Sequence, residues 1–302
     1  MAATVSFILA VRDEPDELLR ATLEGLLRTS DGYQREIVLV DDCSVAPLQI
    51  ELPDILVVRN AEPIGSARSR RTGASFASGD VLSFLDPHMS FAPDWLDKMM
   101  AHVDSGDLLC SAWWDYELTR CHCWGADFRW CGDRDYASGR CPGFDFRHRT
   151  VSPGDGVAEV PMLIGANYMM LRSSYERIGG FSPFFRTWGR LEQDLCLRAW
   201  IVGVGVKCVT DARVGHFSRK KFPYRVCWED IEFNQLATVR TAFEESTARQ
   251  LEHLIQPLAQ VKKSLDETNF NAWRDSIQDR RVITDRELFE KLVPDLPNLL
   301  TN

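Results

Sequence analysis

The first third of the chain alternates short apolar runs with amphipathic segments. Continuous β-branched and apolar runs predict strands that are buried on both faces, as in a parallel sheet. Between the first two runs, leucines recur at helical spacing, which predicts an amphipathic helix. The predicted strands are residues 5–11, 35–42, 54–60, 81–86 and 107–113, and the predicted helices are residues 16–29, residues 65–80 closed by Gly79, and a segment that starts near Pro93.

This alternation predicts the fold class. Strands that alternate with helices at such spacing favour an α/β fold with a doubly wound, mostly parallel central sheet flanked by helices. In such sheets, ligands bind beyond the carboxyl ends of the strands. Asp41 and Asp42 follow the second predicted strand, whereas Asp86 and His88 follow the fourth. We therefore expect a binding site at this edge of the sheet.

The pattern is lost over residues 113–160, which are rich in Trp, Cys, Arg, Gly and Asp. We interpret this segment as a long insertion, with a hairpin, over one rim of the site. Four tryptophans of the insertion either stack on a sugar or acceptor or build a small apolar core, and the pattern leaves both readings open. They are Trp113, Trp114, Trp124 and Trp130.

Regular structure returns after the insertion. We predict a strand within residues 161–172, a helix over residues 191–203 and a last strand over residues 205–216. From about residue 229 the chain is helical and charged, and Pro257 interrupts the helical pattern. The predicted organisation is one α/β domain over residues 1–228, divided at residue 112, and a helical C-terminal extension over residues 229–302.

Composition limits the classes of function. The chain has 302 residues, of which 45% are hydrophobic, so it can bury a large core. A net charge of -9 disfavours a protein that grips DNA mainly through its phosphates, and favours a small ligand or a peptide. No stretch approaches the roughly 20 apolar residues of a membrane span, and the start resembles a core strand more than a signal peptide. We expect a cytoplasmic protein without a membrane partner.

Nine cysteines is an odd number, and thiols of a cytoplasmic protein are expected to stay reduced. Four of them lie close together in the sequence, namely Cys121, Cys123, Cys131 and Cys141. Their spacing matches no common zinc pattern, so the sequence favours partly buried thiols without deciding against a structural zinc site.

The sequence FLDPHMSF, residues 84–91, places a carboxylate and an imidazole two positions apart. Asp-x-His offers two metal ligands on the same side of an extended segment, and Pro87 stiffens the turn between them. The alternative is that Asp86 caps the helix near Pro93 while His88 is a surface residue. The position of Asp86 at the end of a buried strand favours a ligand site.

A third ligand is available in VGHFSRKKFPY, residues 214–224, where His216 follows another predicted strand. A lone histidine there is otherwise a structural residue. Arg219, Lys220 and Lys221 follow closely, and their charges suit an anionic ligand such as a phosphate held by the metal.

In order along the chain, these motifs resemble the catalytic domain of the polypeptide N-acetylgalactosaminyltransferases, within the GT-A nucleotide-sugar glycosyltransferases. The resemblance runs from about residue 5 to residue 224. It is carried by IVLVDDCS, GSARSRRTGASFASGDVLSFLDPH, GANYMMLRSSYERIGGFSPFFRTWGRLEQDLCLRAW and VGHFSRKKFPY. It implies a GT-A fold, with a nucleotide-binding half over residues 1–112 and an acceptor half over residues 113–228.

The resemblance also implies a metal site and a donor. Asp86, His88 and His216 would coordinate Mn2+, or Mg2+, which bridges the two phosphates of a UDP-sugar. Transfer from such a donor requires stabilisation of the charge that develops on the leaving diphosphate, and a metal with arginines provides it. By the same resemblance, Asp41 or Asp42 and Arg68 would contact uridine or ribose. Arg219 and Tyr224 would lie against the diphosphate, and Trp188 would lie near the leaving group.

One segment departs from the family pattern. Where the family has a W-G-G-E-N run, this chain has WGRLEQD, which moves the acidic residue one place along to Glu192. In the broader inverting glycosyltransferases, a carboxylate near this position is the general base, so Glu192 is a catalytic candidate with Asp194 beside it. The alternative is a carboxylate that stabilises a helix N-terminus. Retention of configuration, which the resemblance implies, is left open by this substitution.

The sequence therefore predicts a metal-dependent glycosyltransferase. Its donor would be a UDP-sugar, with UDP-GalNAc or UDP-GlcNAc favoured, and its acceptor a hydroxyl or thiol of a peptide or protein. Two alternatives stay open: an enzyme that modifies a hydroxymethylated base in DNA, which the acidic net charge disfavours, and a nucleotide-binding protein without turnover, which the complete Asp-His-His set disfavours.

Overall fold

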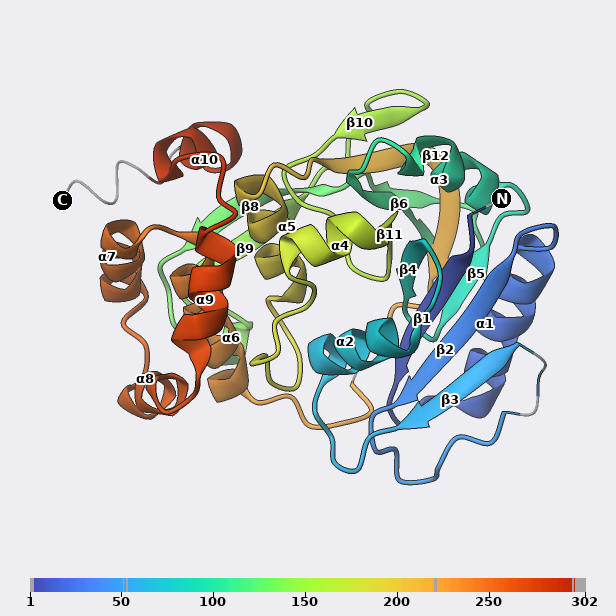
Figure 1. The fold of residues 1–302 in the computed structure, drawn as a ribbon, viewed down its shortest axis with the longest axis horizontal. Coiled ribbons are helices and arrows are strands. Elements are labelled where there is room, and N and C mark those ends of the chain that lie inside the picture. The colour runs from blue at the N-terminus through green and yellow to red at the C-terminus, as the bar shows by residue number, and fades with distance from the viewer. Residues whose placement is uncertain (1–2, 51, 53, 220–221, 295, 297–302) are drawn as a thin grey trace.

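The computed structural model describes residues 3–294 and 296, apart from residues 51, 53, 220 and 221. Within these residues a ten-stranded sheet runs through the molecule and helices lie on both of its faces (Figure 1). The strands of this sheet are β1 (Val5–Val11), β2 (Arg35–Asp41), β3 (Ile55–Arg59), β4 (Val81–Leu85), β5 (Met89–Phe91), β6 (Leu108–Asp115), β7 (Cys121–Cys123), β10 (Val157–Glu159), β11 (Asn167–Leu171) and β12 (Val206–His216).

The sheet has the order β10-β12-β6-β11-β4-β1-β2-β3, with β5 paired to β12 and β7 to β6. Strands β4, β1, β2 and β3 form a parallel block. Because β11 runs antiparallel to both β4 and β6, strands β6 and β12 point the same way as that block. The predicted doubly wound, mostly parallel sheet is confirmed, and the antiparallel β11 near its centre was not predicted.

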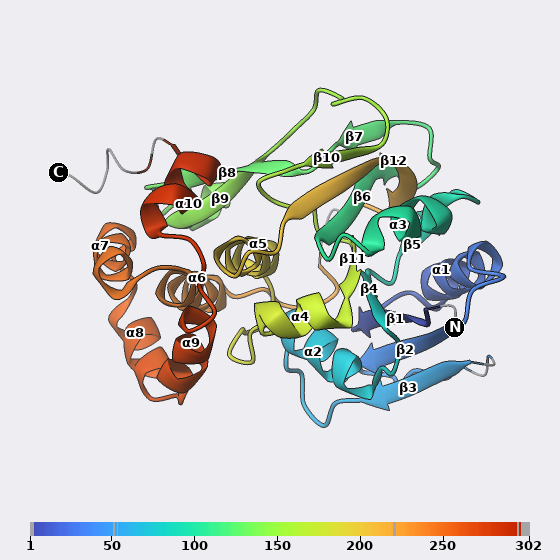
Figure 2. The same cartoon turned by 45° about the horizontal axis from the view of Figure 1, so that its top comes forward.

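The helices of the first two thirds of the chain lie on both faces of the sheet, whereas the C-terminal helices gather at one end of the molecule (Figure 2). The first three predicted helices form, and the C-terminal third is helical, interrupted around Pro257 as the sequence predicts. The helices are α1 (Asp16–Thr29), α2 (Ser66–Phe76), α3 (Trp95–Val103), α4 (Arg172–Ile178), α5 (Leu191–Ile201), α6 (Trp228–Ala242), α7 (Glu245–Ile255), α8 (Ala259–Asp266), α9 (Phe270–Gln278) and α10 (Asp285–Leu292).

Both faces of the sheet are buried, which explains the continuous apolar runs. In β1, Phe7 and Leu9 enter the core beneath α1 and α3, whereas Ile8 enters the core on the side of α2, α4 and α5. All three side chains are fully buried. A strand whose alternate residues pack against two different helix layers has no polar face.

Helix α2 ends at Phe76, three residues before the predicted stop at Gly79. The chain becomes extended at Ala77, and the amides of Ser78 and Gly79 donate to the Glu36 carboxylate. A Cβ at position 79 would lie 2.5 Å from the Ser6 hydroxyl. The glycine therefore serves a close approach to β1 and is not the helix cap that its position suggested.

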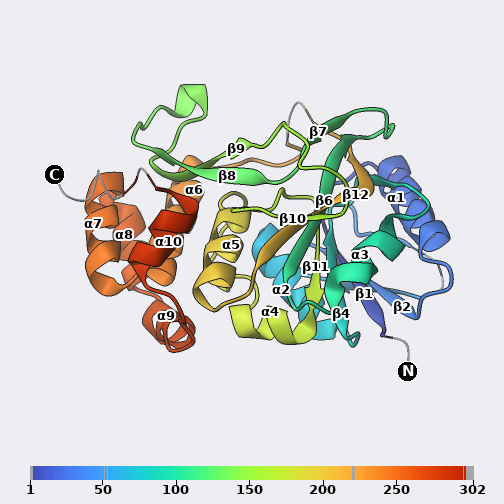
Figure 3. The ribbon, with the colours of Figure 1, turned by 90° about the horizontal axis from the view of Figure 1, so that it is seen from above.

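The insertion contains the expected hairpin. Strands β8 (Ala126–Cys131) and β9 (Gly143–His148) pair antiparallel and form a second, two-stranded sheet. This small sheet lies beside α5 and α6, over one end of the large sheet (Figure 3). A short 3-10 helix, Tyr136–Ser138, lies in the connection between the two strands.

The C-terminal helices share the apolar core of the preceding residues. Helix α6 packs against α5, α7, α8 and α9. The Phe243 ring stacks between Phe144 of β9 and Phe289 of α10, at centroid distances of 5.4 and 5.3 Å. One continuous core spans residue 228. The division into a catalytic domain and an extension at this residue stays a prediction. Among the described residues no helix combines the length and the apolar character needed to cross a membrane.

We predict that Phe243→Ala destabilises the chain by about 3–5 kcal/mol, because it opens a cavity in a fully packed aromatic stack. The free energy of unfolding from urea denaturation tests this. Phe76→Ala is the matched control, since the Phe76 side chain is 53% exposed and its loss is expected to cost less than about 1 kcal/mol. Equal effects of the two substitutions would contradict the prediction.

Candidate active site

Strand pairing brings together two histidines, His88 and His216, that lie far apart in the sequence. Strand β4 delivers Asp86, whose amide donates to the Ala166 carbonyl at 2.8 Å. After Pro87 and His88 the chain turns directly into β5, which pairs with β12 so that Met89 lies opposite His216. The Phe217 amide also donates to the His88 carbonyl, at 3.1 Å. The backbone register therefore fixes His88 beside His216.

The three predicted ligands converge. Nε2 of His88 lies 3.1 Å from Nε2 of His216, and Nε2 of His216 lies 3.3 Å from Oδ2 of Asp86. One ligand atom from each residue lies within 4.8 Å of the others, and no second such group of three His, Cys, Asp or Glu occurs in the described part of the chain. The structure brings together all three residues that the sequence singled out.

The donor set fits a divalent transition metal. Two imidazole nitrogens and one carboxylate oxygen suit ions such as Mn2+. Two neutral imidazoles whose Nε2 atoms face each other cannot both donate, and a shared cation would satisfy both lone pairs. The alternative reading of Asp86 and His88 is wrong: α3 begins only at Trp95, after Asp94, and the His88 side chain is buried.

Arg70 and both histidines hold Asp86 in its ionised form. Burial opposes ionisation, but the hydrogen bond from His216 and the charges of Arg70 and His88 outweigh it and hold the pKa of Asp86 well below its usual range. Nη2 of Arg70 donates to Oδ1 of Asp86 at 2.5 Å. Arg70 comes from α2 and its side chain is almost fully buried.

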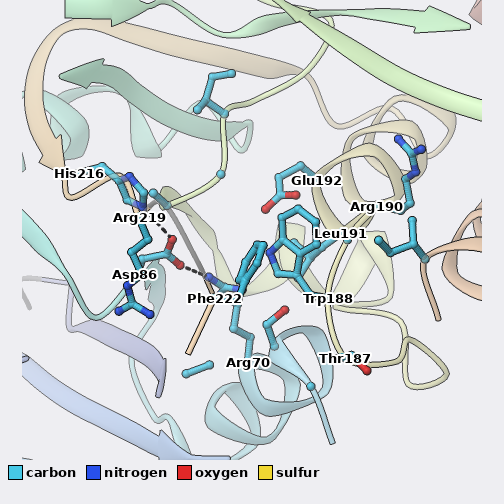
Figure 4. A pocket seen from close by; sticks show the side chains of 18 of the residues that line it. Arg70, Asp86, Thr187, Trp188, Arg190, Leu191, Glu192, His216, Arg219 and Phe222 are labelled. Carbon is cyan, nitrogen blue, oxygen red and sulfur yellow. Dashed lines mark hydrogen bonds and ion pairs between the residues drawn. The ribbon is translucent and has the colours of Figure 1, made fainter. Parts of the chain in front are cut away.

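These ligand atoms open into a cavity of about 680 Å³. One wall comes from the strand ends and the loop after β12, and the opposite wall comes from β9, the start of α5 and α6. Figure 4 shows Asp86, His216 and Arg219 on one side and Glu192, Trp188 and Arg190 on the other. The volume is in the range of small-molecule sites.

Glu192 faces this cavity from the first turn of α5. Its carboxylate lies against Gly165, where a Cβ would come within 2.7 Å of Oε1. It makes no hydrogen bond or ion pair with another described residue. Burial, together with the negative charge of Asp86, raises the pKa of Glu192, and Arg70 opposes this shift only in part.

The fold accommodates the departure of the WGRLEQD segment from the family pattern. Arg190 has a φ of 66°, a left-handed conformation that favours glycine and costs other residues about 1–2 kcal/mol. Its guanidinium offsets this cost by donating to the carbonyls of Phe144 and Cys141 in the insertion. Leu191, at the position where the family pattern has its acidic residue, is buried. The acidic side chain of this segment that reaches the cavity is that of Glu192.

The structure does not bring Asp194 to the cavity. Its side chain is buried and pairs with Arg198 one turn along α5, at 2.9 Å to Nε and 2.5 Å to Nη2. Arg198 also donates to the carbonyls of Ile178 and Gly180. These contacts give Asp194 a packing function.

Of the nucleotide-side candidates, Asp42 lines the cavity and Asp41 does not. Asp42 accepts from the amides of Ile64 and Gly65 at 2.8 and 2.9 Å, which holds the start of α2 against the end of β2. Asp41 is fully buried and forms an ion pair with Arg59 at the end of β3.

Arg68 is half-buried on α2 and lies outside the cavity lining, whereas Arg70, two positions along, lines it. The sequence analysis missed Arg70. The 3.6-residue period of α2 puts positions 68 and 70 on different faces, but the sequence alone does not indicate which face meets β4.

Arg219 and Tyr224 both line the cavity, as the sequence predicts for residues near a diphosphate. Tyr224 lies beneath the guanidinium of Arg12, which is 5.0 Å from its ring centroid. Arg219 forms an ion pair with Glu14 and approaches Nδ1 of His88 at 3.0 Å. Lys220 and Lys221 lie outside the described residues.

The tryptophans of the insertion divide between the two readings. Trp114, Trp124 and Trp130 pack against the main apolar core, whereas Trp113 lines the cavity with its ring centroid 5.8 Å from that of His216. Trp188 lines the cavity from the opposite side and is 41% exposed. All nine cysteines are free thiols.

Comparison with known protein families decides the assignment. The model of glycosyl transferase family 2 matches residues 6–179, more than half of the chain, and that of the N-terminal domain of galactosyltransferase matches residues 147–221. The chain belongs to glycosyl transferase family 2. The first match covers β1 to α4 with Asp86 and His88, and the second covers Glu192, His216 and Arg219.

Similar curated proteins support the resemblance seen in the motifs. Human polypeptide N-acetylgalactosaminyltransferase 14 is 29% identical over 238 residues, 72% of this chain and 41% of the relative. The probable N-acetylgalactosaminyltransferase 6 of Caenorhabditis elegans is 27% identical over 249 residues, 73% of this chain and 38% of the relative. The chain thus spans about two fifths of these relatives. The predicted likeness to their catalytic domains is confirmed.

Solved structures confirm the GT-A fold. GalNAc-T7, solved with UDP, GalNAc and Mn2+, superimposes with a TM-score of 0.74 at 18% identity, over 98% of this chain and 58% of that one. TarS of S. aureus in complex with UDP-GlcNAc gives a TM-score of 0.54 at 14% identity, over 99% of this chain and 86% of that one.

We predict that Asp194→Ala lowers the free energy of unfolding by about 3–5 kcal/mol, because it leaves the buried Arg198 guanidinium without its carboxylate. Urea denaturation measures the loss. The double variant Asp194→Leu, Arg198→Met removes both charges and should recover most of it. An Asp194→Ala protein of normal stability that has lost turnover would instead indicate a role in the reaction.

Proposed function

We propose that the chain is a metal-dependent glycosyltransferase domain that moves a sugar from a UDP-sugar to a hydroxyl or thiol of a peptide or protein. The observation that carries the proposal is the convergence of Asp86, His88 and His216 at a cavity whose rim bears Arg70 and Arg219. Family membership and relatives named as N-acetylgalactosaminyltransferases favour UDP-GalNAc, and the complex of TarS keeps UDP-GlcNAc in consideration.

The three ligands would hold Mn2+ or Mg2+. When bound, the cation supplies positive charge to the diphosphate that leaves the sugar. The chain keeps Asp86 ionised for this purpose through Arg70 and orients the two imidazoles through the β5–β12 register. The structure of GalNAc-T7 with UDP, GalNAc and Mn2+ supports the same choice of ion.

The nucleotide would lie along the edge formed by β1, β2 and β4. Asp42 is the acidic residue there that lines the cavity, and we assign it the contact with uridine or ribose. Arg219 and Tyr224 would lie against the diphosphate, where the guanidinium adds charge-assisted hydrogen bonds. Arg68 and Asp41 lie outside the cavity lining, so the donor contacts expected of them fall to Arg70 and Asp42, which line it.

The acceptor would enter from the side of β9, α5 and α6. Phe146 and Trp188 line the cavity there, and Phe222 of the loop after β12 contacts the Trp188 ring at a centroid distance of 4.8 Å; all three are exposed, which suits an apolar stretch of peptide beside the reacting group. Trp188 would lie over the sugar near the leaving group. Glu192 would take the proton from the acceptor hydroxyl or thiol as the acceptor attacks the sugar carbon.

We predict that Asp86→Ala abolishes manganese-dependent release of UDP from UDP-GalNAc, with a loss of at least ~10²-fold in kcat, because the site loses its only carboxylate ligand. UDP release with and without Mn2+ is the measurement. Asp31→Ala, at an exposed aspartate, should match the original protein. Turnover by Asp86→Ala at an undiminished rate, or unaffected by chelation of the metal, would refute the metal site.

Glu192 gives a prediction on pH. A general base must be ionised, and burial raises the pKa of this carboxyl, so kcat should fall with decreasing pH along a limb displaced above the ordinary carboxylate range. Glu192→Gln should lose about 10²–10⁴-fold in kcat, together with that limb, while the donor KM changes little. Glu176→Gln, an exposed control on α4, should keep both. An unchanged pH profile in Glu192→Gln would exclude it as the base.

A further inference from the structure

A buried carboxylate stands directly behind the proposed metal ligands and has no part in the function proposed above. Glu14 lies in the short connection between β1 and α1, and its side chain is 1% exposed. Oε2 pairs with Arg219 and lies 3.4 Å from Nδ1 of His88. Oε1 is buried at the cavity lining and has no hydrogen-bond partner among the described residues. Such a group is costly to bury without a purpose.

The loop that carries Glu14 is fixed in place. The Asp13 amide donates to the Ser44 hydroxyl at 3.0 Å, and the Asp13 carboxylate accepts from the Val45 amide at 2.8 Å. Asp13 itself has a φ of 51°, a left-handed conformation that these two bonds stabilise. The carboxylate of Glu14 is thereby held near Nδ1 of His88.

The two nitrogens of His88 face different surroundings. Nε2 faces His216 and the proposed cation, whereas Nδ1 faces Glu14 and Arg219. For Nε2 to offer a lone pair to a cation, the ring proton must sit on Nδ1. A proton on Nδ1 needs an acceptor, and Oε2 of Glu14 is placed to accept it.

Arg219 acts against this arrangement. Its Nη2 lies 3.0 Å from Nδ1 of His88, and a guanidinium can only donate. That contact fits the opposite tautomer, in which Nδ1 accepts and Nε2 carries the proton and cannot bind a metal. The two neighbours of Nδ1 therefore stabilise opposite states of the same ring.

We propose that Glu14 is a positioning residue that sets His88 in the metal-binding tautomer, and that Arg219 holds the competing tautomer until a diphosphate draws it away. The inference rests on the proposed function, because it takes the metal site and the diphosphate as given. Binding of the cation and of the anionic donor are then coupled through one imidazole, in addition to any direct contact between them. Outer partners of metal-bound histidines commonly contribute 10–100-fold in affinity.

The first experiment measures binding of Mn2+ alone, without nucleotide, by calorimetric titration of the purified chain. Glu14→Gln should bind Mn2+ about 10–100-fold more weakly than the original protein. Asp145→Asn is the matched control, since it removes a negative charge from the lining of the same cavity without a contact to His88, and it should change the affinity by no more than ~3-fold. If both variants weakened Mn2+ binding equally, the effect of Glu14 would be that of its charge alone, and the proposal would be overturned.

The second experiment reads the tautomer directly, by NMR of the imidazole nitrogens in the metal-free protein. Glu14→Gln should shift His88 toward the form protonated on Nε2, and Arg219→Met should shift it toward the form protonated on Nδ1. His88 signals that stay unchanged in Arg219→Met would overturn the competition, and this variant keeps the test available if Glu14→Gln does not fold. Failure of the original protein to bind Mn2+ at all would instead sink the proposed function.

Discussion

The pairing of β5 with β12 is the constraint on which the site depends. Three residues of β5 pair with the end of β12, and this short antiparallel contact places His88 beside His216 across 128 positions of sequence. His88 lies in the connection between β4 and β5, His216 ends β12, and both side chains line the cavity. The main-chain hydrogen bonds fix the register, and a slip of one residue would turn His216 to the other face of the strand.

Most of the sheet could be predicted from the sequence, because each central strand is buried on both faces and so leaves an unbroken apolar run. The antiparallel direction of β11 could not, since an apolar run does not record strand direction. The stop of α2 was misplaced because Gly79, a helix-ending residue by type, is used for close packing against β1. The local pattern of apolar and polar residues thus predicts which residues are buried, but it does not predict which other residues they pack against.

The site shows the same division. Asp86, His88 and His216 could be recognised because motif and strand end coincide. Arg70 and Glu14 were missed or passed over, because what defines them is a contact made after folding: a 2.5 Å hydrogen bond to Asp86 and a buried position behind His88. Asp194 and Asp41 were chosen by type and position, yet each is a buried carboxylate that pairs with an arginine, Arg198 in the interior and Arg59 at the surface. Acidic side chains near a site divide into those that face it and those that support it, and only the fold separates them.

The wall of the cavity that lies opposite the strand ends includes Trp228 and Ile231 of α6. The sheet edge formed by β1, β2 and β4 is complete early in the sequence, but this wall is not, and α6 is itself packed against α7, α8 and α9. A chain shortened before Trp228 would therefore keep the strand ends that carry the three proposed metal ligands but would lack this wall of the cavity.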